Sequence, residues 1–272
     1  MDLYFCSFAD KRFHKSLKRI QKQAISFNIF SDIWCYNEKK ISKNFKVNLK
    51  EFLNPYTFYL CAWKPQLIIQ CFEKMNDGEV LLYADSGCHL NPNARERLLE
   101  YVNIVVLSTS GILSTVLDDS MPEKNWTKGD TFDYFQCRYN EKITHTAQIQ
   151  ATAFLIQKRP STQLFLKQWL KVFEDNPLLA DRGTYIASNL PGYIEHRSDQ
   201  SFFSILCKIY CVELVSAHEV QGSSNWEREM IKFPIWAKRD KEIDNGFWVH
   251  PTLGRLLLLF RQYWKGKLHS DI

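Results

Sequence analysis

The chain has 272 residues, of which 45% are hydrophobic and 24% are charged, and its 35 basic and 30 acidic side chains leave a formal net charge of +5. This composition is ordinary for a globular protein and excludes a globally disordered chain, a fibrous protein and a polytopic membrane protein. The basic excess is smaller than nucleic-acid-binding proteins usually carry, so no nucleic-acid partner is predicted.

The 8 cysteines are spread singly along the chain, with no Cys-x-x-Cys pair. The first residues lack the basic region and long apolar run of a secretory signal peptide. We therefore expect reduced thiols in a cytoplasmic protein, with neither a disulfide framework nor a zinc site. No stretch reaches the roughly 18 apolar residues that a membrane span requires.

Strand-like and helix-like runs alternate through the first 110 residues. Helical spacing of apolar residues predicts helices that begin near Asp10, Pro65 and Asn91. The short apolar runs predict strands at 3–8, 32–36, 79–84 and 103–107. This order predicts an α/β fold with a mainly parallel sheet and helices on both faces.

The second half of the chain is less regular. Residues 111–150 are polar and are predicted to form a loop, and 176–198 are predicted to form a long connection. The remaining predicted elements are a strand at 151–157, a helix at 161–173, a helix that opens at Ser198 and a strand at 212–215. Because no linker interrupts the chain, we expect a single domain over residues 1–250.

Asp85 directly follows the strand predicted at 79–84, and ligands of parallel sheets bind at the carboxyl ends of strands. A carboxylate there suits Mg²⁺ or Mn²⁺ on a diphosphate, and Ser86 and Gly87 keep the turn tight. The alternative is that Asp85 only caps a turn.

Trp63 and Lys64 precede Pro65 at a predicted helix N-terminus, a position that binds phosphate, and Lys64 adds a full positive charge. The alternative places Trp63 in the core and Lys64 in solvent. Because the chain has only 10 glycines and no glycine-rich phosphate loop, we expect phosphate to be held by a metal or by basic side chains.

Asp199 and Gln200 open a predicted helix directly after His196 and Arg197. Asp199 favours the positive end of the helix dipole, and Ser198 is a plausible N-cap, which accounts for both residues structurally. Polar and cationic groups beside an acid can also hold the hydroxyls of a sugar.

His250 is a candidate second metal ligand beside Asp85, or a structural histidine. The segment 251–272 alternates apolar or aromatic residues with basic ones and has no acid before Asp271. It is predicted to be a basic amphipathic segment that lies on an anionic membrane surface, or else a helix docked on the core.

Together these pieces resemble bacterial glycosyltransferases of the GT-A type, such as those of capsule, O-antigen and lipooligosaccharide biosynthesis. The resemblance covers roughly residues 2–215. Its markers, in chain order, are Ser7-Phe8-Ala9-Asp10, Trp63-Lys64-Pro65, Tyr83-Ala84-Asp85-Ser86-Gly87-Cys88, Trp126-Thr127-Lys128 and His196-Arg197-Ser198-Asp199-Gln200-Ser201.

The resemblance implies a GT-A-like nucleotide-diphospho-sugar transferase fold with a mixed, mainly parallel sheet. It implies a nucleotide-sugar donor bound by Ser7, Phe8, Ala9, Asp10, Trp63, Lys64, Asp85, Ser86 and Gly87. Asp85 matches the first aspartate of the metal-binding Asp-x-Asp motif, but Gly87 replaces the second. A divalent metal, Mn²⁺ or Mg²⁺, would then rest on Asp85 with His250, or basic side chains would replace it.

The resemblance also implies that Asp199 and Gln200 are catalytic. Trp126, Lys128, His196 and Arg197 would contact a saccharide or lipid-linked acceptor. Gln200 favours retention of anomeric configuration, whereas in an inverting enzyme an acid at this place would act as the base. The expected location is the cytoplasm, with the inner face of the cytoplasmic membrane as a further expectation.

Two other functions stay open on the sequence. The missing second aspartate favours a catalytically inactive GT-A-like module that binds a carbohydrate or a partner. A sugar nucleotidyltransferase would have a glycine-rich loop after the first strand, and residues 7–13 contain no glycine.

Overall fold

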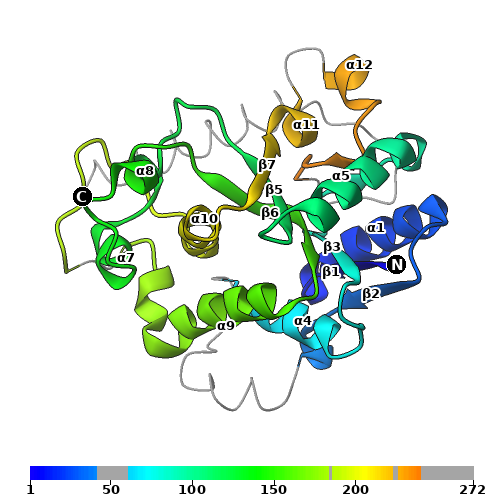
Figure 1. The fold of residues 1–272 in the computed structure, drawn as a ribbon, viewed down its shortest axis with the longest axis horizontal. Coiled ribbons are helices and arrows are strands. Elements are labelled where there is room, and N and C mark those ends of the chain that lie inside the picture. The colour runs from blue at the N-terminus through cyan, green and yellow to red at the C-terminus, as the bar shows by residue number, and fades with distance from the viewer. Residues whose placement is uncertain (42–60, 184–185, 223–225, 240–272) are drawn as a thin grey trace, which may run out of the picture.

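The computed structural model describes residues 1–41, 61–183, 186–222 and 226–239. Its centre is a 6-stranded sheet made of β1 (Leu3–Phe8), β2 (Asp32–Tyr36), β3 (Val80–Ala84), β5 (Ile112–Val116), β6 (Ile149–Gln157) and β7 (Glu213–Ser216). The strand order is β2-β1-β3-β6-β5-β7 (Figure 1). Only β6 runs against the others, pairing antiparallel with β3 and β5, so the sheet is mixed and mainly parallel as predicted.

Helices cover both faces of this sheet (Figure 1). One apolar cluster joins the sheet to α4 (Trp63–Phe72), α9 (Pro160–Asp175) and α10 (Asp199–Ile209). A second cluster joins the other face to α1 (His14–Phe27), α5 (Arg95–Leu107) and α11 (His218–Gln221). Strand side chains alternate between the clusters, as period-two geometry requires. All five residues of β3 are buried, which explains its continuous apolar sequence.

The strand predicted at 103–107 is wrong. These residues are the last turns of α5, whose buried residues Leu98, Tyr101, Val102 and Val105 recur at helical spacing. The β-branched run at its end suits a strand locally, but packing of one face against the sheet decides for the helix. The chain reverses at Gly111, whose φ of 71° favours glycine, and only then enters β5.

The loop predicted over residues 111–150 is also wrong. This stretch contains β5, three short helices and the start of β6. The helices are α6 (Glu123–Trp126), α7 (Gly129–Tyr134) and α8 (Glu141–Thr144). Each has at most 6 residues, too few for a periodic pattern to stand out in the sequence.

Asp10 does not cap α1 directly. A short 3-10 helix, Lys11–Phe13, comes first, and the Asp10 carbonyl accepts the Phe13 amide at 3.0 Å. A small second sheet pairs β4 (His89–Leu90) with β8 (Ile235–Trp236), which follows α12 (Trp226–Met230). The other predicted helices and strands lie within a few residues of their predicted bounds.

The crossovers bring distant segments to one edge of the sheet. Helices α4 and α10 each precede a strand that runs parallel to β1, so both helices begin at the edge where β1 and β3 end. Within the described ranges, no helix is both long and apolar enough to span a bilayer. His250 and the segment 251–272 lie outside the described residues.

Candidate active site

Three charged side chains from separate parts of the chain meet at this edge. Lys64 Nζ lies 3.2 Å from Asp85 Oδ1 and 3.0 Å from Asp199 Oδ2. Lys64 is in the first turn of α4, Asp85 follows β3, and Asp199 begins α10. The fold thus brings together three of the residues singled out in the sequence, and we call them the Lys64 cluster.

Lys64 is held firmly in this place. Its side chain is 3% exposed, and Nζ also donates to the Ala151 carbonyl on β6 at 3.0 Å. An ammonium has three protons, so the two carboxylates and this carbonyl use them all. The ring centroids of Tyr83 and Trp63 lie 5.4 Å and 5.9 Å from Nζ, which adds cation–π contact.

Asp85 is the most open member of the Lys64 cluster, with a side chain that is 39% exposed. The buried Tyr83 hydroxyl donates to Asp85 Oδ1 at 2.6 Å, and the Asp85 amide donates to the Thr152 carbonyl. Burial and the Asp85 charge raise the pKa of Tyr83 well above its ordinary value, so this hydroxyl keeps its proton and stays a donor.

Charge and burial act against each other in the Lys64 cluster. Burial lowers the pKa of Lys64, but the Asp199 and Asp85 carboxylates outweigh it and hold that pKa above its ordinary value. Burial raises the pKa of Asp199, and Lys64 opposes this shift in part. Lys64 is therefore a permanent cation over the pH range in which proteins fold.

A further basic side chain, Arg19, contacts the turn after Asp85. Arg19 Nη2 donates to the carbonyls of Ser86 and Cys88 at 3.0 Å and 3.1 Å. Burial and Asp85 raise the pKa of Cys88, while the charges of Lys64, Arg19 and Arg239 act to lower it. Three basic side chains therefore lie within electrostatic reach of this one turn, and Ser86 and Gly87 form its middle.

The predicted residues at the end of β1 lie at the same edge. The rings of Phe8 and Trp63 stack with centroids 3.9 Å apart. Ser7 and Ala9 are buried, and Ser7 Oγ has no hydrogen-bond partner in the described part of the chain. Asp10 is partly exposed just beyond them. Trp63 is thus a core residue in contact with Phe8, as the structural alternative had it.

Gln200 connects the first turn of α10 to a buried polar network. Its Nε2 donates to Gln148 Oε1 at 2.7 Å, and Gln148 Nε2 donates to Glu123 Oε1 at 3.0 Å. Glu123 is fully buried and also receives Thr127, Ser204 and Lys208. Glu123 accepts from four donors on its two oxygens. Gln148 must therefore turn its NH₂ group toward Glu123 and its carbonyl oxygen toward the NH₂ group of Gln200.

Trp126 and Arg197 lie against each other beside α10. The Arg197 guanidinium is 3.8 Å from the centroid of the Trp126 ring, and the Arg197 amide donates to the Trp126 carbonyl. Burial lowers the pKa of Arg197, and the charges of Arg239 and Arg182 act in the same direction. This pair forms a flat, cationic surface two residues before Asp199.

Lys128 and His196 are buried structural contacts. Lys128 Nζ donates to the carbonyls of Leu178 and Asp181, and its amide donates to His196 Nδ1 at 3.4 Å. Burial lowers the pKa of His196 to about 3, so its ring is neutral. Both side chains are almost inaccessible, at 1% and 0% exposure, and neither is open to an acceptor in this conformation.

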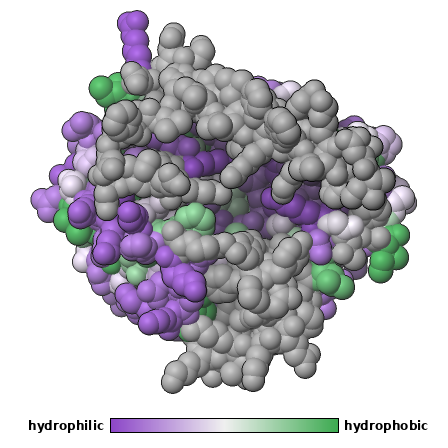
Figure 2. All heavy atoms as spheres, turned by 180° about the vertical axis from the view of Figure 1, so that it is seen from behind, coloured by the Kyte–Doolittle hydropathy of each residue, from purple (hydrophilic) through white to green (hydrophobic). Residues whose placement is uncertain are grey.

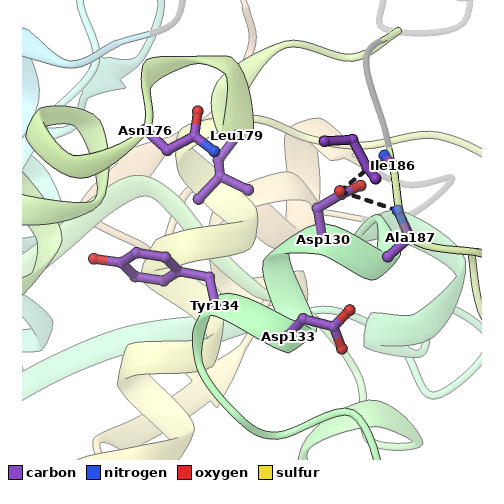
Figure 3. Close-up of a pocket in the computed structure, with 7 residues that line it drawn as sticks. All are labelled: Asp130, Asp133, Tyr134, Asn176, Leu179, Ile186 and Ala187. Carbon is purple, nitrogen blue, oxygen red and sulfur yellow. Dashed lines mark hydrogen bonds between the residues drawn. The ribbon is translucent and has the colours of Figure 1, made fainter.

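A pocket of about 350 Å³ lies elsewhere, between α7 and the segment after α9 (Figure 3). Asp130 Oδ1 accepts the amides of Ile186 and Ala187, while Oδ2 is buried with no hydrogen-bond partner among the described residues. The pocket contains none of the residues predicted from sequence, and its lining combines two carboxylates with polar and apolar side chains: Asp130, Asp133, Tyr134, Asn176, Leu179, Ile186 and Ala187. On the face turned away from the viewer of Figure 1, many of the visible described residues are hydrophilic (Figure 2).

The described residues do not fit a divalent metal. Both carboxylates of the Lys64 cluster already bind the ammonium, and Gly87 offers no side-chain ligand. Within the described ranges, no three His, Cys, Asp or Glu side chains are grouped so that they could hold a metal ion. The predicted second ligand, His250, is not among the described residues.

The sequence assigned no site role to several residues of this region, although Tyr83 belongs to one of the markers of the resemblance. Gln148 and Glu123 connect to Gln200, Tyr83 holds Asp85, and Arg19 holds the following turn. A glutamine just before the apolar strand β6 is a weak signal of a buried polar contact. Arg19 carries none, because it lies among other basic residues on α1.

No protein-family model and no curated protein sequence matches the chain at a significant level. Several solved structures are similar in part. A glycosyltransferase involved in glycosylation of the major capsid of PBCV-1 is 12% identical with a TM-score of 0.47, over 89% of this chain and 100% of that one. Mouse xyloside xylosyltransferase 1 is 9% identical with a TM-score of 0.48, over 92% and 100%.

A third structure, the galactosyltransferase LgtC in complex with donor and acceptor sugar analogues, is 13% identical with a TM-score of 0.41. It covers 87% of this chain and 86% of its own. At such TM-scores and identities, these similarities do not establish an activity for this chain. What it does must be argued from its own geometry.

Proposed function

We propose that the chain is a glycosyltransferase of the GT-A type, which moves a sugar from a nucleotide-sugar donor to a saccharide or lipid-linked acceptor. One observation carries the proposal. Lys64, Asp85 and Asp199 converge at the carboxyl edge of a mainly parallel sheet, where ligands of such sheets bind.

The chemistry of sugar transfer matches this arrangement. When the glycosidic bond to the diphosphate breaks, negative charge grows on the leaving group and positive charge on the sugar ring. The basic groups around the turn after Asp85 suit the first charge, and the buried Lys64 ammonium acts on it through its electrostatic field. The Asp199 carboxylate and the Gln200 amide carbonyl suit the second, and the Arg197–Trp126 pair beside them offers a stacking surface for a sugar.

The finer assignment rests on the sequence resemblance. We propose transfer of a hexose in surface-polysaccharide assembly, of the capsule, O-antigen or lipooligosaccharide kind. Retention of configuration is favoured because Gln200, an amide, follows Asp199. An inverting route would instead use Asp199 to take the proton of the acceptor hydroxyl.

The first test is a thermal-shift panel of UDP-, GDP-, CMP- and dTDP-sugars on the full chain. A ligand that binds only the folded state raises its stability with the logarithm of concentration over Kd. We expect one donor class to raise the melting temperature, and Asp199→Asn and Asp85→Asn to lower transfer from that donor at least about 100-fold.

Asp77→Asn is the matched control. Asp77 precedes β3, so it lies at the opposite edge of the sheet, and its side chain is 76% exposed. If Asp199→Asn and Asp85→Asn are folded and transfer sugar at the wild-type rate, the assignment of the site is contradicted. Saturable donor binding without transfer to any acceptor would instead indicate a catalytically inactive binding module, and a flat panel would remove the nucleotide-sugar proposal altogether.

Contact of residues 251–272 with an anionic membrane stays a separate proposal, because these residues are not described. The test is pelleting with anionic liposomes, comparing the full chain with one that ends at residue 250. Equal sedimentation of the two would contradict membrane contact through this segment.

A further inference from the structure

The Lys64 cluster has the form of a cation site whose cation is already part of the chain. Two carboxylates from different elements face one point, and the Lys64 ammonium is at that point, within hydrogen-bond distance of both. A divalent ion bridging the same oxygens would need that space, because Mg²⁺ and Ca²⁺ bind oxygen at about 2.0–2.6 Å.

Lys64 cannot leave this position without a large cost. Its side chain is buried, all three protons are donated, and both carboxylates would lose their partner. Asp85 Oδ1 accepts the Tyr83 hydroxyl as well, so this oxygen already has two donors. A metal bound at this oxygen would have to compete with both donors.

The surroundings supply the positive charge that a metal would otherwise bring. Arg19 and Arg239, together with Lys64, act electrostatically on the turn that follows Asp85. Arg19 is held there by its bonds to the Ser86 and Cys88 carbonyls, and the position of Gly87 provides no further carboxylate. A diphosphate can be met at this turn by basic side chains alone.

We propose that the Lys64 ammonium takes the place of a divalent metal, so that Asp85 and Asp199 bind no Mn²⁺ or Mg²⁺ and the site works with its own cations. The inference rests on the proposed function for its catalytic meaning. Its binding part is independent of that function, because it concerns only the two carboxylates and the ammonium between them.

The test is a gain of metal binding. Lys64→Met keeps the length and apolar stem of the side chain but removes the charge, which leaves the two carboxylates without their shared cation. Mn²⁺ binding is measured without any nucleotide, by the electron paramagnetic resonance signal of free Mn²⁺. We expect no saturable binding by the wild type at millimolar Mn²⁺. Lys64→Met should bind Mn²⁺ at least about tenfold more tightly than the upper limit that this experiment sets for the wild type.

The double variant Lys64→Met/Asp85→Asn should return to the wild-type level, and Lys64→Arg, which keeps the charge, should also bind no Mn²⁺. A folded Lys64→Met that gains no binding overturns the proposal. Saturable Mn²⁺ binding by the wild type that is lost in Asp85→Asn overturns it too, and this second comparison needs no Lys64 variant to fold.

Once a donor is known, transfer by the wild type should change less than about twofold, or ~0.4 kcal/mol, when a chelator replaces added Mn²⁺, because the cluster binds no metal for the chelator to remove. Loss of transfer in the chelator would overturn the catalytic part of the proposal. Failure of every nucleotide sugar to bind would refute the proposed function and leave the Mn²⁺ comparison unaffected.

Discussion

The side-chain amide of Gln200 donates to Oε1 of Gln148 at 2.7 Å, and Gln148 in turn donates to the buried carboxylate of Glu123. Glu123 accepts from Lys208 as well, so the orientations of the Gln148 and Gln200 amides in this run of hydrogen bonds are both determined. It engages one proton of the Gln200 NH₂ group, and the carbonyl oxygen of that side chain takes no part in this run of hydrogen bonds. Since a partly positive sugar ring is stabilised by an oxygen and not by an NH₂ group, this polarity suits the proposed transfer.

Gln148→Leu should therefore lower kcat about tenfold with little change in KM for the donor, because the Gln200 amide loses the contact that orients it. Steady-state kinetics with varied donor separate the two parameters. The matched control is Thr127→Val, which removes another hydrogen bond to the same Glu123 oxygen without touching Gln200. An equal loss of kcat in both variants would mean that stability of the network, and not amide orientation, matters.

His196 should make the fold sensitive to acid. Its pKa is about 3 in the folded state against an ordinary 6.5, so only the unfolded chain takes up a proton between these values. The contribution of neutral His196 to the free energy of unfolding is fully present above its ordinary pKa, and it falls as the pH is lowered through this window. At pH 5 the loss is about 2 kcal/mol relative to neutral pH.

His196→Gln keeps an acceptor for the Lys128 amide and does not titrate. Urea unfolding at pH 7 and pH 5 should therefore show a smaller loss in the variant than in the wild type. A pH dependence that is the same in both proteins would show that His196 titrates normally in the folded state.

Lys208→Met should destabilise the fold by about 3 kcal/mol, because it leaves the Glu123 charge buried and unpaired. The Lys208 ammonium lies 2.8 Å from Glu123 Oε2, and the two side chains are 9% and 0% exposed. Denaturant unfolding measures the change. Adding Glu123→Gln to Lys208→Met should recover part of the stability, and no recovery would place the cost in packing and not in charge.

Ser198 should be replaceable by glycine with a gain. It has φ 49° and ψ −122°, a conformation that side-chain-bearing residues rarely adopt, and its hydroxyl makes no capping bond to α10. Ser198→Gly relieves this strain. The glycine also makes the unfolded chain more flexible, so folding costs more conformational entropy and part of the gain is offset. We expect a net gain of ~1 kcal/mol in the free energy of unfolding. Ser198→Ala keeps the β-carbon and should show no gain in the same thermal or urea experiment.

The architecture could be predicted largely from the sequence, because long elements repeat their apolar residues regularly. The helix that opens at Ser198 is of this kind, and the buried strand before Asp85 was recognisable by its continuous apolar run instead. The run 103–107 misled because its β-branched residues suit a strand, and only the face packed on the sheet reveals the helix. The short helices α6, α7 and α8 give too few residues for any period.

Three of the residues predicted from sequence meet in the structure, but the contacts between them could not be predicted. Lys64, Asp85 and Asp199 were singled out separately, each from its place at the end of a predicted element. The sheet lets one ammonium bind both carboxylates, because it brings Lys64 to Asp85, 21 positions later in the chain, and to Asp199, 135 positions later. Buried partners such as Gln148 and Glu123 depend on the same non-local packing, for which a single sequence has no pattern.

The antiparallel strand β6 has a consequence for synthesis of the chain on the ribosome. It fills the gap between β3 and β5, yet both of these strands are translated before it. Until residue 157 has emerged, the apolar β3 has an open edge that can pair with other nascent chains. Asp199 is translated later still, so a chain that stops after β6 has paired both edges of β3 but lacks a completed Lys64 cluster. The open edge of β3 would need protection by chaperones mainly in the interval before β6 emerges.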